Sequence, residues 1–234
     1  MAHPTDPSGL ATELASMARD LLAQPTVQQT LDRVVAHAVS LVHGCEAAGI
    51  LVIHGREVHT LATTSELARA SDAVQGELGE GPCLNATLQE EQVFRIADMS
   101  KAGDRWPRYA PRARELGIGS AMGFLLYTEE ENLGALNLYA SQPNAFGTEN
   151  EHVGWLLASH AAVAFASARN DAQLREAIAT RQEIGEALGI LMERYKITDG
   201  QAFDLMRKES QTRNVKVRQI ARLVTETGGI NRDE

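Results

Sequence analysis

Six basic residues lie close together near the end of the chain, with a single acidic residue among them. The stretch between Leu205 and Arg222 has one carboxylate, Glu209, and its basic residues are Arg207, Lys208, Arg213, Lys216, Arg218 and Arg222. The whole chain carries a formal net charge of −9, so this stretch is opposite in sign to the rest. Like charges at this spacing repel unless an anion relieves them. The pattern therefore favours a surface that binds a polyanion, although a solvated helical face has similar charges.

The charge of the chain changes near residue 173. Residues 1–173 hold 11 Lys and Arg against 21 Asp and Glu, whereas residues 174–234 hold 11 against 10. Apolar residues make up 44% of the 234 residues and charged residues 23%, as in an ordinary globular protein. No apolar run is long enough for a membrane span and no secretory signal is visible, so we expect a cytoplasmic protein.

Candidate sites for other chemistry are sparse. Cys83 follows Gly-Pro at the start of an expected short helix, where a thiol can have a lowered pKa and sense redox change, or can serve as a small buried apolar group. Trp106 and Tyr109 could line a ligand cleft or belong to the core. The histidines have no metal spacing, and the glycine-rich Gly79–Gly81 stretch lacks the Lys-Ser/Thr of a phosphate loop. We therefore predict no catalytic residues, no metal and no cofactor, and a protein that is not an enzyme.

The apolar periodicity predicts how these residues are positioned. Up to residue 147 the expected order is two helices, a strand pair, a short helix, a strand, a helix that begins at Pro107, and a second strand pair. The ranges are about 9–23 and 27–42, then 47–53 and 58–64, then 83–88, 92–97, 107–116, 120–127 and 133–141. This order predicts an α+β domain with an antiparallel sheet flanked by helices.

A long helix is expected to follow, from a capping box at Thr148 and Glu151 to Tyr195. About 45 residues without a helix stop exceed the usual length of a globular helix and suggest a coiled coil or signalling stalk. Two apolar stripes, one on the first helix and one on this helix, predict a homodimer, unless the first helix covers the last within one chain. These stripes are Leu10, Leu14, Met17 and Leu21, and Leu174, Ile178, Ile184, Leu188 and Leu191, with Arg181 interrupting the second.

Two shorter helices complete an expected all-α three-helix bundle. Thr198 and Gln201 form a capping box for a helix to about residue 210, whose inward face would be Ala202, Phe203, Leu205 and Met206. Asn214 would cap the last helix, which packs Val217, Ile220, Ala221 and Val224 inward and stops at Gly228-Gly229.

Three motifs follow one another in this last part: Thr180–Tyr195 (TRQEIGEALGILMERY), Ala202–Arg207 (AFDLMR) and Ser210-Gln211. Together they resemble the ANTAR domain, a family of RNA-binding modules of transcription antitermination regulators. The resemblance covers residues 174–226. It implies RNA binding by the six basic residues. Where many family members have a lysine before the glycine, this chain has Leu188.

The preceding region resembles a GAF domain of actinobacterial GAF–ANTAR proteins, and four motifs carry the resemblance. They are Gly79–Cys83 (GEGPC), Asp104–Pro107 (DRWP), Gly119-Ser120 and Gly134–Tyr139 (GALNLY). We therefore divide the chain into an N-terminal helix (1–26), a GAF-like sensor (27–170) and an ANTAR-like RNA-binding domain (171–234). The resemblance implies a possible small-molecule ligand near Cys83, Trp106 and Tyr109, with the long helix joining the two domains.

The expected function is binding of RNA hairpins in nascent transcripts, which would prevent a terminator from forming. One alternative is a DNA-binding regulator with the same sensor, because residues 198–224 also suit a helix-turn-helix, although the link from Ser210 to Asn214 lacks the usual turn glycine. The other is a redox-active GAF protein that works through Cys83.

Overall fold

The computed structural model describes residues 7–55, 57–84 and 92–230. It divides into two compact units, Met1–Asn170 and Asp171–Glu234. The helices are α1 (Pro7–Leu22), α2 (Val27–Leu41), α3 (Glu66–Leu78), the 3-10 helix η1 (Met99–Asp104), α5 (Tyr109–Glu115), α6 (Thr148–Tyr195), α7 (Asp199–Arg213) and α8 (Val217–Thr227). The strands are β1 (Ala47–His54), β2 (Glu57–Thr63), β3 (Val93–Ile96), β4 (Ser120–Tyr127) and β5 (Asn132–Ala140). The short helix expected at 83–88 lies mostly outside the described residues.

The strands form one antiparallel sheet in the first unit, in the order β2-β1-β5-β4-β3. The two predicted strand pairs are the hairpins β1–β2 and β4–β5, and β5 lies at the centre between β1 and β4. This confirms the α+β prediction, and no strand bound differs from the expected one by more than one residue.

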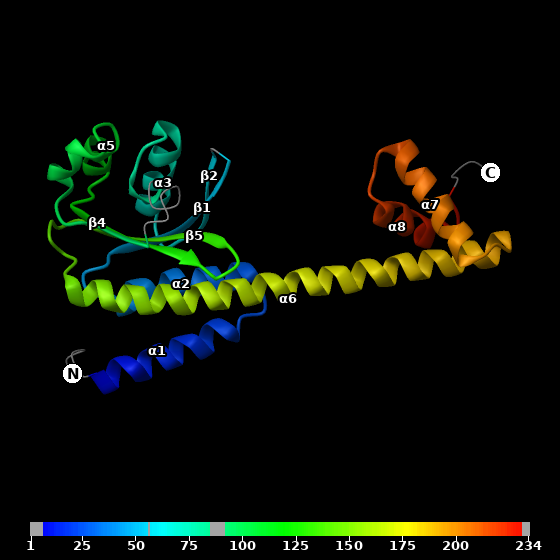
Figure 1. The fold of residues 1–234 in the computed structure, drawn as a ribbon, viewed down its shortest axis with the longest axis horizontal. Helices are drawn as coiled ribbons and strands as arrows, with labels where there is room; N and C mark the ends of the chain where they lie inside the picture. Colours follow the sequence, from blue (N-terminus) through cyan, green and yellow to red (C-terminus); the bar gives the residue numbers. More distant parts are fainter. Residues whose placement is uncertain (1–6, 56, 85–91, 231–234) are drawn as a thin grey trace. The chain divides into compact units, whose positions relative to one another are not determined.

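Helices cover both faces of the sheet (Figure 1). The α2 helix, the first part of α6 and, outside them, α1 lie on one face, whereas α3 and α5 lie on the other. Successive residues of β5 alternate between the two layers: Leu136 and Leu138 pack towards α2 and α6, and Ala135 and Tyr139 pack towards α3 and α5. Because both faces are buried, β5 reads as a nearly continuous apolar run.

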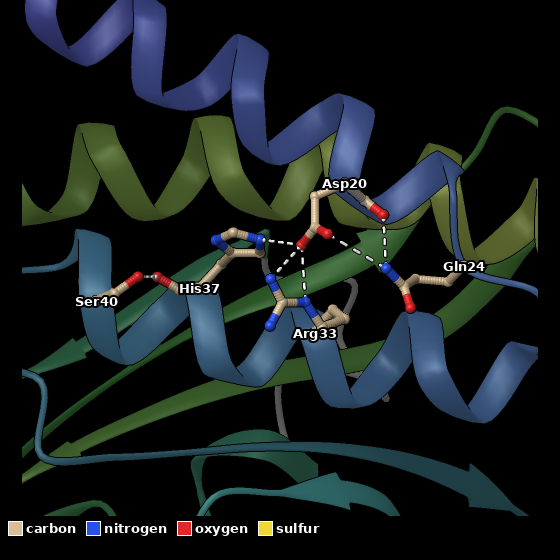
Figure 2. Close-up of polar contacts among 5 residues, drawn as sticks. All are labelled: Asp20, Gln24, Arg33, His37 and Ser40. Atoms are coloured by element: carbon tan, nitrogen blue, oxygen red, sulfur yellow. Dashed lines mark hydrogen bonds and ion pairs between the residues drawn. The ribbon is translucent and has the colours of Figure 1, made fainter.

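The first helix packs within its own unit. Leu14, Met17 and Leu21 are buried in the core beside α2 and α6. Figure 2 shows the polar contact beside them, where the Asp20 carboxylate lies 2.6 Å from an Arg33 guanidinium nitrogen and 2.7 Å from His37 Nε2 on α2. The hydrogen bond with His37, followed by that with Arg33, lowers the pKa of Asp20. The apolar stripe of α1, which suggested a second protomer as its partner, is thus covered by helices of the same chain.

Helix α3 was not predicted. The Ser65 side chain caps its first turn by accepting a hydrogen bond from the Ala68 N–H, and Gly79 ends it with a φ of +61°. Its buried positions include Ser71, Asp72 and Gln75, and these polar residues interrupt the apolar periodicity on which the sequence analysis relied. Helix α5 begins at Tyr109 rather than at Pro107.

The start of α6 corrects the predicted capping box. Thr148 is already the first helical residue, and the preceding Gly147 N–H donates to Asn150 Oδ1 at 2.8 Å. The Glu151 carboxylate lies 3.4 Å from an Arg95 guanidinium nitrogen instead of reaching back to the backbone. The helix runs to Tyr195, as expected.

The second unit is a bundle of the end of α6 with α7 and α8. Its buried residues are Ala187, Leu191, Ala202, Met206, Ile220, Ala221, Val224 and Ile230. The capping box of Thr198 and Gln201 is confirmed. The prediction of a buried Phe203 is wrong, because Phe203 is 40% exposed whereas its neighbour Ala202 and Met206 one turn later are fully buried. One residue is 100° of helical rotation, which takes Phe203 off the inward face.

The turn between α7 and α8 gives Asn214 a different role from the predicted one. Asn214 adopts a left-handed conformation (φ +52°) and ends α7, and α8 begins with Lys216 at its N-cap position. Asparagine tolerates this conformation, which lets the chain reverse without a glycine. The predicted stop of α8 at Gly228 is confirmed by its φ of +74°.

The burial difference between Met206 and Phe203 predicts different costs of truncation. We expect Met206→Ala to lower the free energy of unfolding of the bundle by about 2–5 kcal/mol, because it leaves a cavity. Phe203→Ala should cost about 1 kcal/mol, since much of that side chain already lies in water. Hydrogen exchange of α8 amides in the full-length protein measures both. A larger loss of protection for Phe203→Ala would contradict the packing described above.

Candidate nucleic-acid interface and buried polar cluster

The six basic residues lie on α7 and α8 and in the turn between them. Four of them, all arginines, form ion pairs within the bundle. The nitrogen–oxygen distances are 2.8 Å for Arg207–Asp204, 2.5 Å for Arg213–Glu209, 2.5 Å for Arg218–Glu176 and 2.9 Å for Arg222–Glu183. Carboxylates of the same unit therefore relieve much of the repulsion that the sequence indicated.

Two of these pairs join α8 to α6. Arg218 and Arg222 are one helical turn apart and reach Glu176 and Glu183 on α6, and the bond with Glu183 raises the pKa of Arg222. A groove of about 270 Å³ lies between the two helices, with Thr180 among the residues that line it. The sequence analysis missed the α6 carboxylates, although Glu176, Thr180 and Glu183 have the i, i+4, i+7 spacing of one helix face.

The two lysines differ from the arginines. Lys208 and Lys216 are exposed, and neither forms an ion pair with another residue that the structure describes. They can meet a phosphate without giving up a partner. Arg207 and Arg213 can exchange a carboxylate for a phosphate at small cost, because surface ion pairs contribute only about 0–1 kcal/mol. With the two lysines they can contribute to binding an anionic ligand, whereas Glu176 and Glu183 hold Arg218 and Arg222 beside the groove.

Leu188, which replaces a lysine common in the ANTAR family, packs against the bundle core. It is half-buried beside Ala187 and Leu191 and shares their apolar surroundings. In this chain the position stabilises the bundle.

Cys83, Trp106 and Tyr109 lie in the layer between the sheet and the helices α3 and α5. All three are buried, with exposures of 0%, 3% and 0%. The Cys83 thiol donates to Asn137 Oδ1 at 2.8 Å, and burial raises the pKa of this thiol well above its ordinary value. The environment therefore keeps Cys83 a neutral thiol, which is the opposite of the lowered pKa that a redox sensor needs.

A buried polar cluster surrounds these residues. The Ser71 hydroxyl lies 2.8 Å from the Tyr109 hydroxyl and donates to the Tyr139 hydroxyl at 3.2 Å. Asp72 Oδ2 accepts from the Thr60 hydroxyl at 2.9 Å, and burial raises the pKa of Asp72 to about 7. Ser71 and Asp72 were not predicted as site residues, because they lie on α3, which the apolar periodicity did not indicate.

Two buried donors near this cluster have no hydrogen-bond partner among the described residues, namely Trp106 Nε1 and Asn137 Nδ2. A buried N–H without an acceptor is costly, so each of these groups is suited to donate a hydrogen bond to an oxygen or nitrogen atom of a ligand. Within the described residues, no group of three or more His, Cys, Asp or Glu is arranged to hold a metal ion. None of the described helices combines the length and apolar character that a membrane crossing requires.

The raised pKa of Asp72 predicts a pH-dependent stability. The folded state binds a proton up to about pH 7, whereas the unfolded chain loses it near pH 3.8, so stability falls as the pH rises between these values. The slope should approach about 1.4 kcal/mol per pH unit for one proton. We expect Asp72→Asn to remove this slope in denaturant titrations between pH 4.5 and 7.5. The exposed Asp171→Asn is the control and should leave it unchanged. Equal slopes in wild type and Asp72→Asn would contradict the assignment.

Comparisons with known proteins agree with this architecture. Residues 24–166 match the family model of the GAF domain, and residues 172–224 match that of the ANTAR domain. No curated protein matches the chain. The GAF match alone covers more than half of the chain.

Solved structures share the fold of the first unit. The GAF domain of a phosphoenolpyruvate-protein phosphotransferase from Coxiella burnetii is 22% identical with a TM-score of 0.55, over 72% of this chain and 99% of that one. The phytochrome photosensory core module of Stigmatella aurantiaca is 12% identical with a TM-score of 0.62, over 90% of this chain and 46% of its own length. The chromophore-binding domain of a bacteriophytochrome from R. palustris is 10% identical with a TM-score of 0.55, over 70% and 62%.

The chain thus spans less than two thirds of the two phytochrome structures, and these identities support the fold alone. The two family matches occur in the order that the motifs predicted, with the sensor first and the RNA-binding type of domain after it. They do not distinguish an actinobacterial type from others. The chain belongs to the GAF domain family and is a regulator in which a GAF domain is followed by an ANTAR domain.

Proposed function

We propose that this protein binds RNA hairpins in nascent transcripts through α7 and α8, and thereby favours an RNA structure that prevents a terminator from forming. The observation that carries the proposal is the exposed basic surface of an ANTAR domain within an acidic chain, with two lysines that have no carboxylate partner among the described residues. A protein that only binds acts by shifting a population towards the state that it prefers.

RNA suits the arrangement of α8 better than duplex DNA does. A helix that reads a DNA major groove presents its side chains outward to the bases. In α8, Arg218 and Arg222 instead face carboxylates of α6 at the side of the helix. RNA loops, whose bases and backbone are splayed, can be reached by such lateral side chains.

The GAF domain is proposed to control this binding from the buried polar cluster. A small-molecule ligand near Cys83, Trp106 and Tyr109 would find two unsatisfied donors, Trp106 Nε1 and Asn137 Nδ2. Binding there would change the packing of α3 and α5 against the sheet.

The protein is also proposed to be a cytoplasmic homodimer. On α6, Leu174 and Ile178 are one turn apart and 61% and 59% exposed, so they form an apolar stripe in water. Burial of two such stripes against each other would remove this surface from water.

Removal of the two lysines tests the RNA proposal. Lys208→Ala with Lys216→Ala should weaken hairpin binding and make the slope of log affinity against log salt shallower by about 1.4–1.8, or 0.7–0.9 per lost phosphate contact. The measurement is a titration of the full-length protein with a labelled hairpin pool at several salt concentrations. Arg69→Ala with Lys101→Ala in the GAF domain removes the same charge and should leave affinity and slope unchanged. An unaltered slope in the lysine variant would refute the assignment.

A charged residue in the apolar stripe of Leu174 and Ile178 tests the dimer proposal. Light scattering at micromolar concentration should give twice the chain mass of 25.4 kDa for the wild type. Ile178→Glu should raise the dissociation constant at least about tenfold, because a buried carboxylate has no partner there. Ala172→Glu, on a different face of the same helix, should leave it unaltered. A wild-type mass of 25.4 kDa at all concentrations would rule out the dimer.

A further inference from the structure

The groove between α6 and α8 is lined by carboxylates and neutral side chains as well as by arginines, and phosphate contacts do not explain this combination. Its lining residues are Glu176, Ala179, Thr180, Glu183, Arg218, Gln219 and Arg222. From this lining we infer that the groove binds one unpaired nucleotide of an RNA loop. The inference rests on the proposed RNA binding and assigns a site for reading a base, whereas the lysines contact the backbone.

The geometry places ion pairs at both ends of the groove. Glu176 pairs with Arg218 at 2.5 Å and Glu183 with Arg222 at 2.9 Å. In sequence, Thr180 lies between the two glutamates and Gln219 between the two arginines. The uncharged lining residues are Ala179, Thr180 and Gln219, and the last two carry polar side chains.

The neutral side chains are available to a ligand. Neither the Thr180 hydroxyl nor the Gln219 amide makes a side-chain hydrogen bond with another residue of the described part. A hydroxyl and a primary amide each offer both a donor and an acceptor. Together they can pair with the edge of a base without disturbing either ion pair.

The carboxylates argue for a base and against a phosphate alone. A phosphate site needs donors, and Glu176 and Glu183 would repel an anion. Base edges carry N–H donors as well as acceptors, so carboxylate oxygens and guanidinium groups side by side suit them. An arginine held by a carboxylate also presents a planar face on which a base can stack.

The volume of the groove limits how many RNA bases it can hold. Its volume of about 270 Å³ is at or below the lower end of the range for small-molecule pockets, about 300–1,000 Å³. This space suits a single base better than two stacked bases. The groove would therefore contribute sequence discrimination, which phosphate contacts alone do not.

A purely structural role of the groove makes a different prediction. If the ion pairs serve only to hold α8 on α6, substitutions that keep both pairs should leave RNA binding unchanged. Thr180→Val and Gln219→Ala keep all four charged residues and remove the neutral polar groups. The matched control is Gln182→Ala with Thr225→Val, which removes the same groups from α6 and α8 outside the groove.

The experiment uses the full-length protein and RNA hairpins with a constant stem and a randomised loop. The tightest hairpin is selected, and each loop base in turn is replaced by an abasic nucleotide. Base stacking and pairing contribute about 1–3 kcal/mol per base, so loss of the base in the groove should weaken wild-type binding at least about fivefold. In Thr180→Val/Gln219→Ala the intact hairpin should bind about as weakly, and the same abasic change should have no further effect.

The outcomes separate the two proposals. The inference holds if removal of one loop base weakens binding to the wild type and to the control variant but not to the groove variant. The slope of log affinity against log salt should stay at the wild-type value in the groove variant. It is overturned if every abasic penalty is the same in the wild type and the groove variant, and RNA binding that depends on Lys208 and Lys216 would then still stand. If no hairpin binds more tightly than an unstructured RNA of equal length, both the inference and the proposed function fail.

Discussion

Apolar residues of a helix must be removed from water, and in α6 they contribute to two different hydrophobic cores. Leu157 and Phe165 pack against the sheet of the GAF domain with α1 and α2, whereas Ala187 and Leu191 pack against α7 and α8. Each core would be incomplete without its part of this helix. Between the two parts, Leu174 and Ile178 remain in water, and this exposed stretch is the one that the proposed dimer would bury. The burial of α6 therefore connects the sensor domain with the RNA-binding domain.

The charge distribution of the bundle separates two tasks. Arginines that are held by carboxylates keep a defined direction, while Lys208 and Lys216 have no carboxylate partner among the residues that the structure describes. Free ammonium groups act through charge and respond strongly to salt. Fixed guanidinium groups with neighbouring acceptors act through geometry. We propose that the free ammonium groups attract RNA in general and that the fixed guanidinium groups help to discriminate between loops.

The polar cluster of the GAF domain is where we propose that a ligand binds. Apolar contacts have no directional preference, whereas hydrogen bonds fix the side chains here: Thr60 donates to Asp72, and the Ser71 and Tyr109 hydroxyls bond to each other. Trp106 Nε1 and Asn137 Nδ2 have no acceptor within the described part of the chain, and a buried donor without an acceptor makes the packing less favourable. A ligand that satisfies them would stabilise one arrangement of α3 and α5 over another.

The sequence by itself determined the elements with strong periodicity. It predicted α1, α2, the two hairpins, the full length of α6 and the capping box of α7, because apolar spacing and capping residues are local signals. It could not predict α3, whose inward face is partly polar, or the exposure of Phe203, which depends on a rotation of one residue. Only the tertiary structure decided that the α1 stripe is covered within the chain, that Cys83 is a buried neutral thiol, and that Arg218 and Arg222 meet carboxylates more than thirty residues away. The physical reason is that burial and charge pairing depend on contacts between distant segments, which no local pattern records.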